Sequence, residues 1–276
     1  ERAAQRAIIM EAAKLKRDSI MRVNQERLAL RKMQFSRDSF LKSKYYKDSI
    51  ALVSGANRGI GKAITEELLN KGIKKVYAGA RKLESLTELK EKYGDRLELV
   101  QLDVTKQASV DNAAKLASDA TMLINNAGVL AHGGYKSENM LDSINQNMEV
   151  NVLGVARLTQ AVLPNIENKP NATIATVSSV VGLGSMPMMN GYCTSKAAVH
   201  SMIQGLRGEL QDSNVLVSGI YPGPIETDMA KGFEGIELDK PENLAKNVVI
   251  ALEQGEEDVF PDVMSAQVKQ AYGTTP

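Results

Sequence analysis

Tyr192 and Lys196 have the residue types and spacing that proton transfer requires. They stand four residues apart in the segment Tyr192-Cys193-Thr194-Ser195-Lys196, and on the expected helix their side chains would share one face. A phenol with an ordinary pKa of about 10 is a poor base at neutral pH, and a neighbouring ammonium would favour its phenolate. The pair could therefore exchange a proton with a bound alcohol or carbonyl group. A packed tyrosine beside a surface lysine would show the same spacing.

Two serines precede this pair. Ser179 stands thirteen residues before Tyr192, and Ser178 comes directly before it, at the end of an expected strand over residues 173–178. A hydroxyl at this place can donate a hydrogen bond to a carbonyl and stabilise the charge that develops on its oxygen. Alternation along a strand directs the two side chains to opposite faces. The residues alone leave open which serine takes part.

A glycine-rich turn follows the first expected strand and precedes a helix. It contains Gly55, Gly59 and Gly61, with Asn57, Arg58 and Ile60 between them. Glycines in this position let the main chain approach a pyrophosphate, and the amino terminus of the helix offers unpaired N–H groups. The pattern predicts nucleotide binding, although glycines alone would also fit an ordinary tight turn.

Two arginines indicate which dinucleotide binds. The second expected strand ends in Ala78-Gly79-Ala80-Arg81, without the acidic residue that would hold a ribose 2′-hydroxyl. Arg81 could instead pair with a 2′-phosphate, and Arg58 in the glycine turn is a second candidate. Either arginine alone could be a solvated surface charge. The two together favour NADP(H) over NAD(H).

Strands and helices are expected to alternate from residue 48 on, which predicts an α/β fold with a doubly wound parallel sheet (a Rossmann fold). The expected strands cover residues 49–54, 75–79, 97–102, 121–125, 173–178, 215–220 and, weakly, 259–260. The expected helices cover residues 62–70, 83–92, 108–117, 140–163, 195–210 and 243–252. In such a fold the ligand lies beyond the carboxyl ends of the strands.

Further motifs complete a family pattern. Asp103-Val104 follows the third expected strand, Asn125-Asn126-Ala127-Gly128 the fourth, and Pro222-Gly223-Pro224-Ile225-Glu226-Thr227 the sixth. Together with the glycine turn, Asn151, Ser179, Tyr192 and Lys196, they resemble the short-chain dehydrogenase/reductase family over residues 48 to about 265. The match extends to the order and spacing of these residues.

The resemblance implies an NADP(H)-dependent oxidoreductase that transfers a hydride to or from a carbonyl or alcohol substrate, with Tyr192 as acid/base. It selects Ser179 as the serine that orients the oxygen, and it gives Lys196 a second task of holding the cofactor ribose. Asn151 would hold a water that links Lys196 to solvent. The implied cofactor contacts are Asp103 and Val104 at the adenine, Asn126, Ala127 and Gly128 beside the cofactor, and Pro222, Gly223, Ile225 and Thr227 on the nicotinamide side.

The substrate pocket is expected to form from residues 129–134, from Met186, Pro187, Met188 and Met189, and from a glycine-containing loop over residues 229–237 that could act as a lid. The methionines favour a small or medium apolar ketone or aldehyde, although methionine is also ordinary core filler. Cys193 is expected to pack rather than to react. His132 and His200 lack the spacing of metal ligands, so no metal is expected. The alternative function is a non-catalytic NADP(H)-binding sensor or scaffold that acts through the amino-terminal segment.

Residues 1–47 differ in charge from the rest of the chain. They carry 13 of the 34 Lys and Arg residues but 5 of the 33 Asp and Glu residues, which leaves +8 in this segment and −7 after it. Their composition predicts a basic helical extension that binds a protein partner or is a fused segment; a membrane surface or nucleic acid is a less favoured partner. A single cysteine and the absence of a long apolar stretch suggest a cytoplasmic protein. Family resemblance suggests a homodimer or homotetramer.

Overall fold

The computed structural model describes residues 11, 14, 45–187, 189–233 and 235–273. The predicted extension over residues 1–47 therefore lies outside the described residues, apart from Glu11, Lys14 and residues 45–47. The unit that follows it, Lys44–Pro276, contains every residue expected to take part in chemistry.

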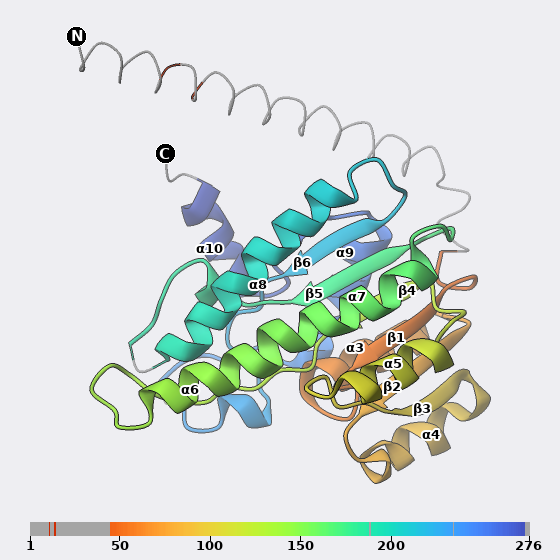
Figure 1. Cartoon of the computed structure of the whole chain (residues 1–276), viewed down its shortest axis with the longest axis horizontal. Coiled ribbons are helices and arrows are strands. Elements are labelled where there is room, and N and C mark those ends of the chain that lie inside the picture. Colours follow the sequence, from red (N-terminus) through yellow and green to blue (C-terminus); the bar gives the residue numbers. More distant parts are fainter. Residues whose placement is uncertain (1–10, 12–13, 15–44, 188, 234, 274–276) are drawn as a thin grey trace. The chain divides into compact units, whose positions relative to one another are not determined.

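One sheet of seven parallel strands forms the centre of this unit, in the order β3-β2-β1-β4-β5-β6-β7 (Figure 1). The strands are β1 (Ile50–Ser54), β2 (Lys75–Ala80), β3 (Leu97–Gln101), β4 (Met122–Asn125), β5 (Thr173–Val177), β6 (Leu216–Ile220) and β7 (Asp258–Val259). Strands β1, β4 and β5 form where short apolar runs end in Ser or Asn, and they are buried throughout, as strands covered on both faces are. The predicted doubly wound fold is confirmed.

Helices cover both faces of the sheet, as Figure 1 shows. They are α3 (Gly59–Asn70), α4 (Thr87–Tyr93), α5 (Gln107–Leu116), α6 (Met140–Asn147), α7 (Gly154–Ile166), α8 (Asn190–Glu209), α9 (Pro241–Glu253) and α10 (Val263–Gly273). Helices α3 and α9 pack together on one face, and α5 and α7 pack together on the other, beside α8. A π-helical segment, Met148–Leu153, joins α6 to α7.

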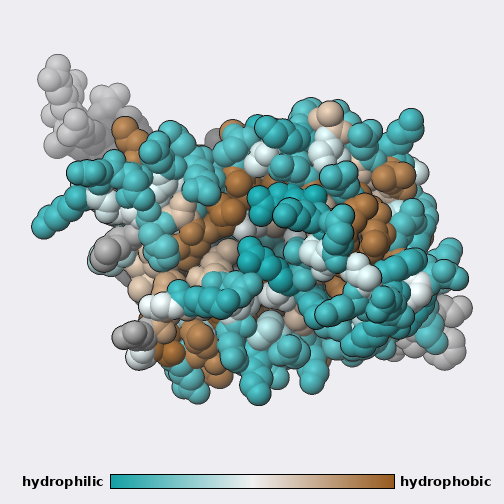
Figure 2. Space-filling model, turned by 90° about the horizontal axis from the view of Figure 1, so that it is seen from below, coloured by the Kyte–Doolittle hydropathy of each residue, from teal (hydrophilic) through white to brown (hydrophobic). Residues whose placement is uncertain are grey.

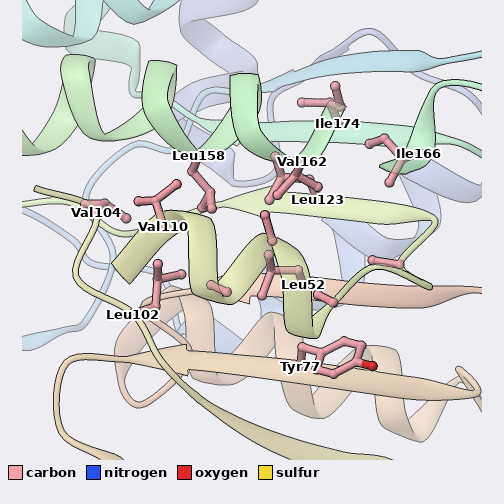
Figure 3. Close-up of a cluster of buried hydrophobic side chains, with 14 of the residues drawn as sticks. Leu52, Tyr77, Leu102, Val104, Val110, Leu123, Leu158, Val162, Ile166 and Ile174 are labelled. Atoms are coloured by element: carbon pink, nitrogen blue, oxygen red, sulfur yellow. The ribbon is translucent and has the colours of Figure 1, made fainter. Parts of the chain in front are cut away.

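The core on the α5, α7 and α8 side begins with one row of side chains across the sheet. Leu52 of β1 is in register with Tyr77 of β2 and with Leu123 of β4, and Leu123 is in register with Ile174 of β5. All four are buried, and Leu158 of α7 lies against them (Figure 3). Burial of such side chains contributes roughly 1.5–3 kcal/mol each, so this row fixes the helices over the sheet.

The helices differ from the sequence-based expectation in several places. The expected helix over residues 83–92 is a 3-10 helix (Leu83–Leu86) followed by α4, and the expected helix over residues 140–163 is α6, the π-helical segment and α7. Helices α8 and α10 differ most. Helix α8 begins at Asn190, not at Ser195, because Gly191 lets it pack against α6: a Cβ on Gly191 would lie 3.0 Å from the Ile144 main chain. Helix α10 was not predicted at all. It begins after Asp262, whose carboxylate accepts a hydrogen bond from the Ser265 N–H at 2.9 Å and so caps the helix.

Tyr45 and Tyr46 attach the start of the domain to the sheet. Both are buried; the Tyr45 hydroxyl lies 2.8 Å from Thr173 Oγ1 at the start of β5, and the Tyr46 hydroxyl donates to the Val249 carbonyl of α9. The chain thus enters the domain at the amino ends of the strands, away from the edge where ligands bind in this type of sheet.

Among the described residues, no helix is long and apolar enough to cross a membrane. Figure 2 shows one face of the molecule, where hydrophilic residues dominate and hydrophobic ones gather mainly in the recessed parts.

Candidate active site

The carboxyl ends of β1, β4, β5 and β6 bring the sequence-predicted residues to one edge of the sheet. The glycine turn follows β1, Asn126 follows β4, Ser179 follows β5, and Pro222 follows β6. Helix α8 contributes Tyr192 and Lys196 to the same group of residues. The parallel strands therefore assemble residues that are up to 170 positions apart, as between Arg58 and Asp228, which form an ion pair.

The glycine positions of this turn have no room for side chains. Gly55 and Gly59 have φ angles of +66° and +52°, which other L-residues rarely adopt. A Cβ on Gly61 would lie 2.2 Å from the Gly55 carbonyl oxygen and 2.3 Å from Asn126 Nδ2. The same Asn126 amide donates to the Ser54 and Gly55 carbonyls at 3.0 Å each, so the turn is fastened to the end of β4.

This turn fits a pyrophosphate. Helix α3 starts at Gly59, and among the described residues no side chain caps it. Its first N–H groups and its dipole are thus directed at the space in front of the turn, where they favour an anion. A bare main-chain surface and a free helix terminus are the two features that a dinucleotide phosphate needs.

The two predicted phosphate-binding arginines differ in their surroundings. Arg81 is exposed after β2 and lies near Asp103. Burial alone would raise the pKa of Asp103, but hydrogen bonds from Thr105 and the charge of Arg81 lower it below its usual value. Arg58 Nη1 instead pairs with Asp228 Oδ2 at 3.1 Å, and both side chains are largely exposed. Arg58 is therefore placed between the glycine turn and the loop after β6.

Ser179, Tyr192 and Lys196 come together in a buried cluster. Each is 6–8% exposed. The Lys196 ammonium donates to the Val177 carbonyl at 2.8 Å and lies 5.6 Å from the centre of the Tyr192 ring. Ser179 Oγ donates to the Pro222 carbonyl at 3.2 Å.

The two serines follow β5 directly and have different hydrogen-bond partners. Ser178 Oγ turns away from this cluster and donates to the Lys196 main-chain carbonyl at 3.1 Å. Ser179 faces Tyr192, with which it forms a hydrogen bond that affects the Tyr192 pKa. The side chain of Ser179, not that of Ser178, can therefore contact a bound oxygen beside Tyr192.

The pKa values in this cluster follow from burial. Burial raises the pKa of Tyr192 well above its usual range; the nearby Cys193 raises it further, and the Ser179 hydrogen bond offsets part of the rise. Burial also lowers the pKa of Lys196 from 10.5 to about 8. Burial of the phenol therefore shifts the Tyr192 pKa in the direction opposite to the expected lowering, and Lys196 is not among the causes of the shift.

Asn151 lies in the π-helical segment and is 1% exposed. Its Nδ2 donates to the Val129 carbonyl and to Ser195 Oγ, both at 3.0 Å, while its Oδ1 accepts from the Val129 N–H at 2.8 Å. A Cβ on Gly128 would lie 3.2 Å from Asn151 Oδ1 and 3.9 Å from Lys196 Nζ. Asn151 and Lys196 therefore both border Gly128, but the Asn151 side chain holds the main chain of Val129, so the expected water would need another group of Asn151.

The residues after β6 connect to the cluster and to the glycine turn. The Pro222 carbonyl accepts from Ser179 Oγ, and the Gly223 N–H donates to Asp262 Oδ2 at 2.8 Å. Thr227 lies beside the glycine turn: a Cβ added to Gly59 would be 3.2 Å from Thr227 Cγ2. Sequence reasoning missed Asp262, although the spacing Asp262-x-x-Ser265 is a helix-start pattern that could have identified it.

Apolar side chains surround the Tyr192 ring. Met189 and Cys193 are buried with it, and three partly buried residues pack against them: Leu130, Val181 and Phe233. Three of the expected pocket segments thus meet here; Val181 was missed, although it follows Ser179 closely. Met186 and Met229 are exposed at the margin, and Met188 lies outside the described residues. Cys193 Sγ accepts a hydrogen bond from the Met186 N–H, as a packed thiol can.

Within the described part of the chain, no group of three or more His, Cys, Asp or Glu residues is placed to hold a metal ion.

Comparison with known proteins places this arrangement among related chains. Residues 49–235 match the short chain dehydrogenase family. An uncharacterized oxidoreductase of Staphylococcus aureus is 30% identical over 213 residues, which cover 75% of this chain and 92% of that protein. An uncharacterized oxidoreductase of Staphylococcus saprophyticus is also 30% identical, with the same coverage.

Solved structures agree with these sequence matches. A short chain dehydrogenase from Burkholderia cenocepacia in complex with NADP has 32% identity and a TM-score of 0.77, over 83% of this chain and 94% of that one. An alcohol dehydrogenase from Thermococcus sibiricus complexed with 5-hydroxy-NADP has 26% identity and a TM-score of 0.68, over 76% and 94%.

Proposed function

Because the chain belongs to the short-chain dehydrogenase family, we propose that it is an NADP(H)-dependent reductase of a carbonyl group, with Tyr192 as acid/base. The observation that carries the proposal is the buried cluster of Ser179, Tyr192 and Lys196 beside a glycine turn that fits a pyrophosphate. A packed tyrosine without a function would not need a hydroxyl partner and an ammonium in the same buried space.

NADP(H) is the proposed cofactor. The absence of an acid at the end of β2 and the presence of Arg81 and Arg58 favour a 2′-phosphate. Related structures in complex with NADP support this choice. By family resemblance, Asp103 and Val104 contact the adenine, Lys196 the ribose, and Thr227 the nicotinamide carboxamide.

In the proposed reaction each residue has a task that its surroundings favour. NADPH, when bound, supplies a hydride to the carbonyl carbon. Tyr192 is protonated at neutral pH, as a phenol of ordinary pKa about 10 also is, and it donates that proton to the carbonyl oxygen. Ser179 orients the same oxygen. Lys196, with a pKa of about 8, remains mostly charged at neutral pH and can return a proton toward Tyr192.

The proposed substrate is a small or medium apolar ketone or aldehyde. The side chains around Tyr192 support this, since Leu130, Val181, Met189 and Phe233 are apolar. Lys231, a cation of the loop over residues 229–237, pairs with Asp228.

Self-association is part of the proposal. Leu141 of α6 and Leu153 at the end of the π-helical segment are 71% and 44% exposed, which suits a contact between copies of the chain. We infer a homodimer or homotetramer, which light scattering of the full chain would measure. The role of residues 1–47 as a partner-binding extension stays a prediction.

The test is NADPH and NADH oxidation by the purified chain over a panel of ketones and aldehydes. Tyr192→Phe should abolish turnover but leave NADPH binding, whereas Tyr272→Phe, a change at a half-exposed tyrosine of α10, should leave both. Tight NADPH binding without turnover of any compound would favour the sensor or scaffold instead.

A further inference from the structure

We propose that Asn147 is a positioning residue of the substrate site: it fixes the main chain of Ala131 and thereby sets where Leu130 stands against Tyr192. The proposal rests on the proposed reductase function, because it assigns a specificity element to that same site.

The Asn147 side chain is fully buried and paired with one residue of the loop after Gly128. Its Oδ1 accepts from the Ala131 N–H at 3.2 Å, and its Nδ2 donates to the Ala131 carbonyl at 2.9 Å. Ser143 Oγ adds a second bond to that carbonyl at 2.7 Å. Both polar groups of the Ala131 main chain are therefore held by side chains of α6.

The Asn151 side chain pairs with the Val129 main chain in the same way: its Oδ1 accepts from the N–H at 2.8 Å, and its Nδ2 donates to the carbonyl at 3.0 Å. Two asparagine amides, four positions apart on the helical segment, thus pair with two loop residues that are two positions apart. Each amide pairs with the N–H and the C=O of one residue, which is how a neighbouring strand would hold an extended chain. The helix therefore takes the place of a strand partner for this loop.

Leu130 lies between the two held residues. Successive side chains of an extended segment point to opposite sides, so the pairing of Val129 and Ala131 with the helix turns Leu130 away from it. Leu130 indeed packs against the cluster of Met189, Tyr192 and Cys193. The asparagine pair consequently determines the distance between this leucine and the catalytic phenol.

The far end of the loop is held independently. Gly133 forms a bridge with Met189, and a Cβ on Gly133 would lie 2.7 Å from Ser143 Cβ. Buried asparagine is unfavourable inside a helix unless its amide is paired. The Asn147 amide has its partners in the loop and in the Ser143 carbonyl, so it serves the loop more than its own helix.

The tests are Asn147→Leu, which removes both bonds at similar volume, and Asn147→Asp, which keeps the acceptor for the Ala131 N–H but loses the donor. Asn165→Asp is the matched control, because its Nδ2 bonds to the Ala114 carbonyl at 2.8 Å from α7. A series of methyl ketones of increasing chain length is reduced with NADPH, and kcat and KM are measured separately. Amide hydrogen exchange of Val129 and Ala131 is followed in parallel.

We expect both Asn147 variants to raise KM for the preferred ketone about tenfold, the scale on which apolar pockets discriminate, with kcat and its pH profile little changed. The preference among chain lengths should shrink. Ala131 should exchange faster in Asn147→Leu while Val129 stays protected. Asn165→Asp should change none of these. Leu130→Ala should shift the same chain-length preference. The double variant Leu130→Ala/Asn147→Asp should differ little from Leu130→Ala in this preference. This comparison tests the positioning role even if Asn147→Leu does not fold.

Unchanged Ala131 exchange in Asn147→Leu, or an unchanged chain-length preference in folded Asn147 variants of an active enzyme, would overturn the positioning role. A wild-type chain that neither reduces nor binds any ketone would refute the proposed function, and the positioning role would fall with it. The exchange data tell these two failures apart, because they report the loop clamp without turnover.

Discussion

Lys196→Met should stabilise the ligand-free chain at neutral pH although it removes a residue of the proposed catalytic cluster. Lys196 is 6% exposed, and burial lowers its pKa from 10.5 to about 8. The native state therefore holds this proton less tightly than the unfolded chain. A buried ammonium in an apolar setting costs stability as long as it stays charged in both states, and methionine has a similar shape without the charge.

The magnitude follows from the two pKa values. One pKa unit corresponds to 1.36 kcal/mol, so the drop from 10.5 to about 8 costs about 3 kcal/mol at pH 7, where Lys196 is charged in both states. The cost falls as pH rises through 8, because the native state then releases its proton first, and about 1 kcal/mol remains at pH 10. Methionine also loses the bond to the Val177 carbonyl, worth about 1 kcal/mol. The variant should be more stable by about 2 kcal/mol at pH 7 and about equal at pH 10.

Urea unfolding of both proteins at pH 7, 8.5 and 10 measures this difference. Tyr192 is present in both proteins, so its titration contributes nearly equally to both free energies of unfolding and largely cancels in their difference. Lys71→Met, a change at an exposed lysine after α3, controls for the loss of any positive charge. A Lys196→Met variant that is less stable than wild type at pH 7, or a difference that does not change with pH, would refute the reasoning.

Three further predictions concern cofactor and loop. Gly61→Ala should raise the Kd for NADPH by tenfold or more in calorimetry, because its Cβ would lie 2.2 Å from a main-chain oxygen. Gly205→Ala, whose Cβ would have no atom within 4 Å, should leave this Kd unchanged. Arg81→Ala should weaken NADPH binding about tenfold, with little change for NADH, if it pairs with the 2′-phosphate. Asp262→Ala should lower stability by about 2 kcal/mol in urea unfolding and raise KM for NADPH, because α10 loses its cap and the Gly223 N–H its partner.

The strands and the glycine turn could be predicted because their causes are local. A strand buried on both faces is a short apolar run, and a sharp turn at its end requires glycine, so β1 and Gly55 are visible in the sequence itself. The start of α8 could not be predicted, because Asn190 and Gly191 are weak helix formers. They are helical because Gly191 lets α8 approach α6 closely.

The candidate site was predicted to a similar degree. Motif order identified Ser179, Tyr192 and Lys196, and the fold brings all three together. Asn147 and Asp262 were missed, since each acts on main-chain groups of a loop that is distant in sequence. The pairing of Asn147 with the Ala131 main chain leaves no spacing pattern in the sequence, whereas Asp262 shows there only as the start of a helix.

The sequence by itself determined the sheet, the turn that fits a phosphate and the residues that we propose to react, because these depend on local runs and on residue type. Tertiary structure decided which serine faces Tyr192 and how tightly that phenol holds its proton. Both follow from what surrounds a side chain after folding: the Ser178 hydroxyl is bonded to the Lys196 main-chain carbonyl, and burial, not the charge of Lys196, governs the Tyr192 pKa.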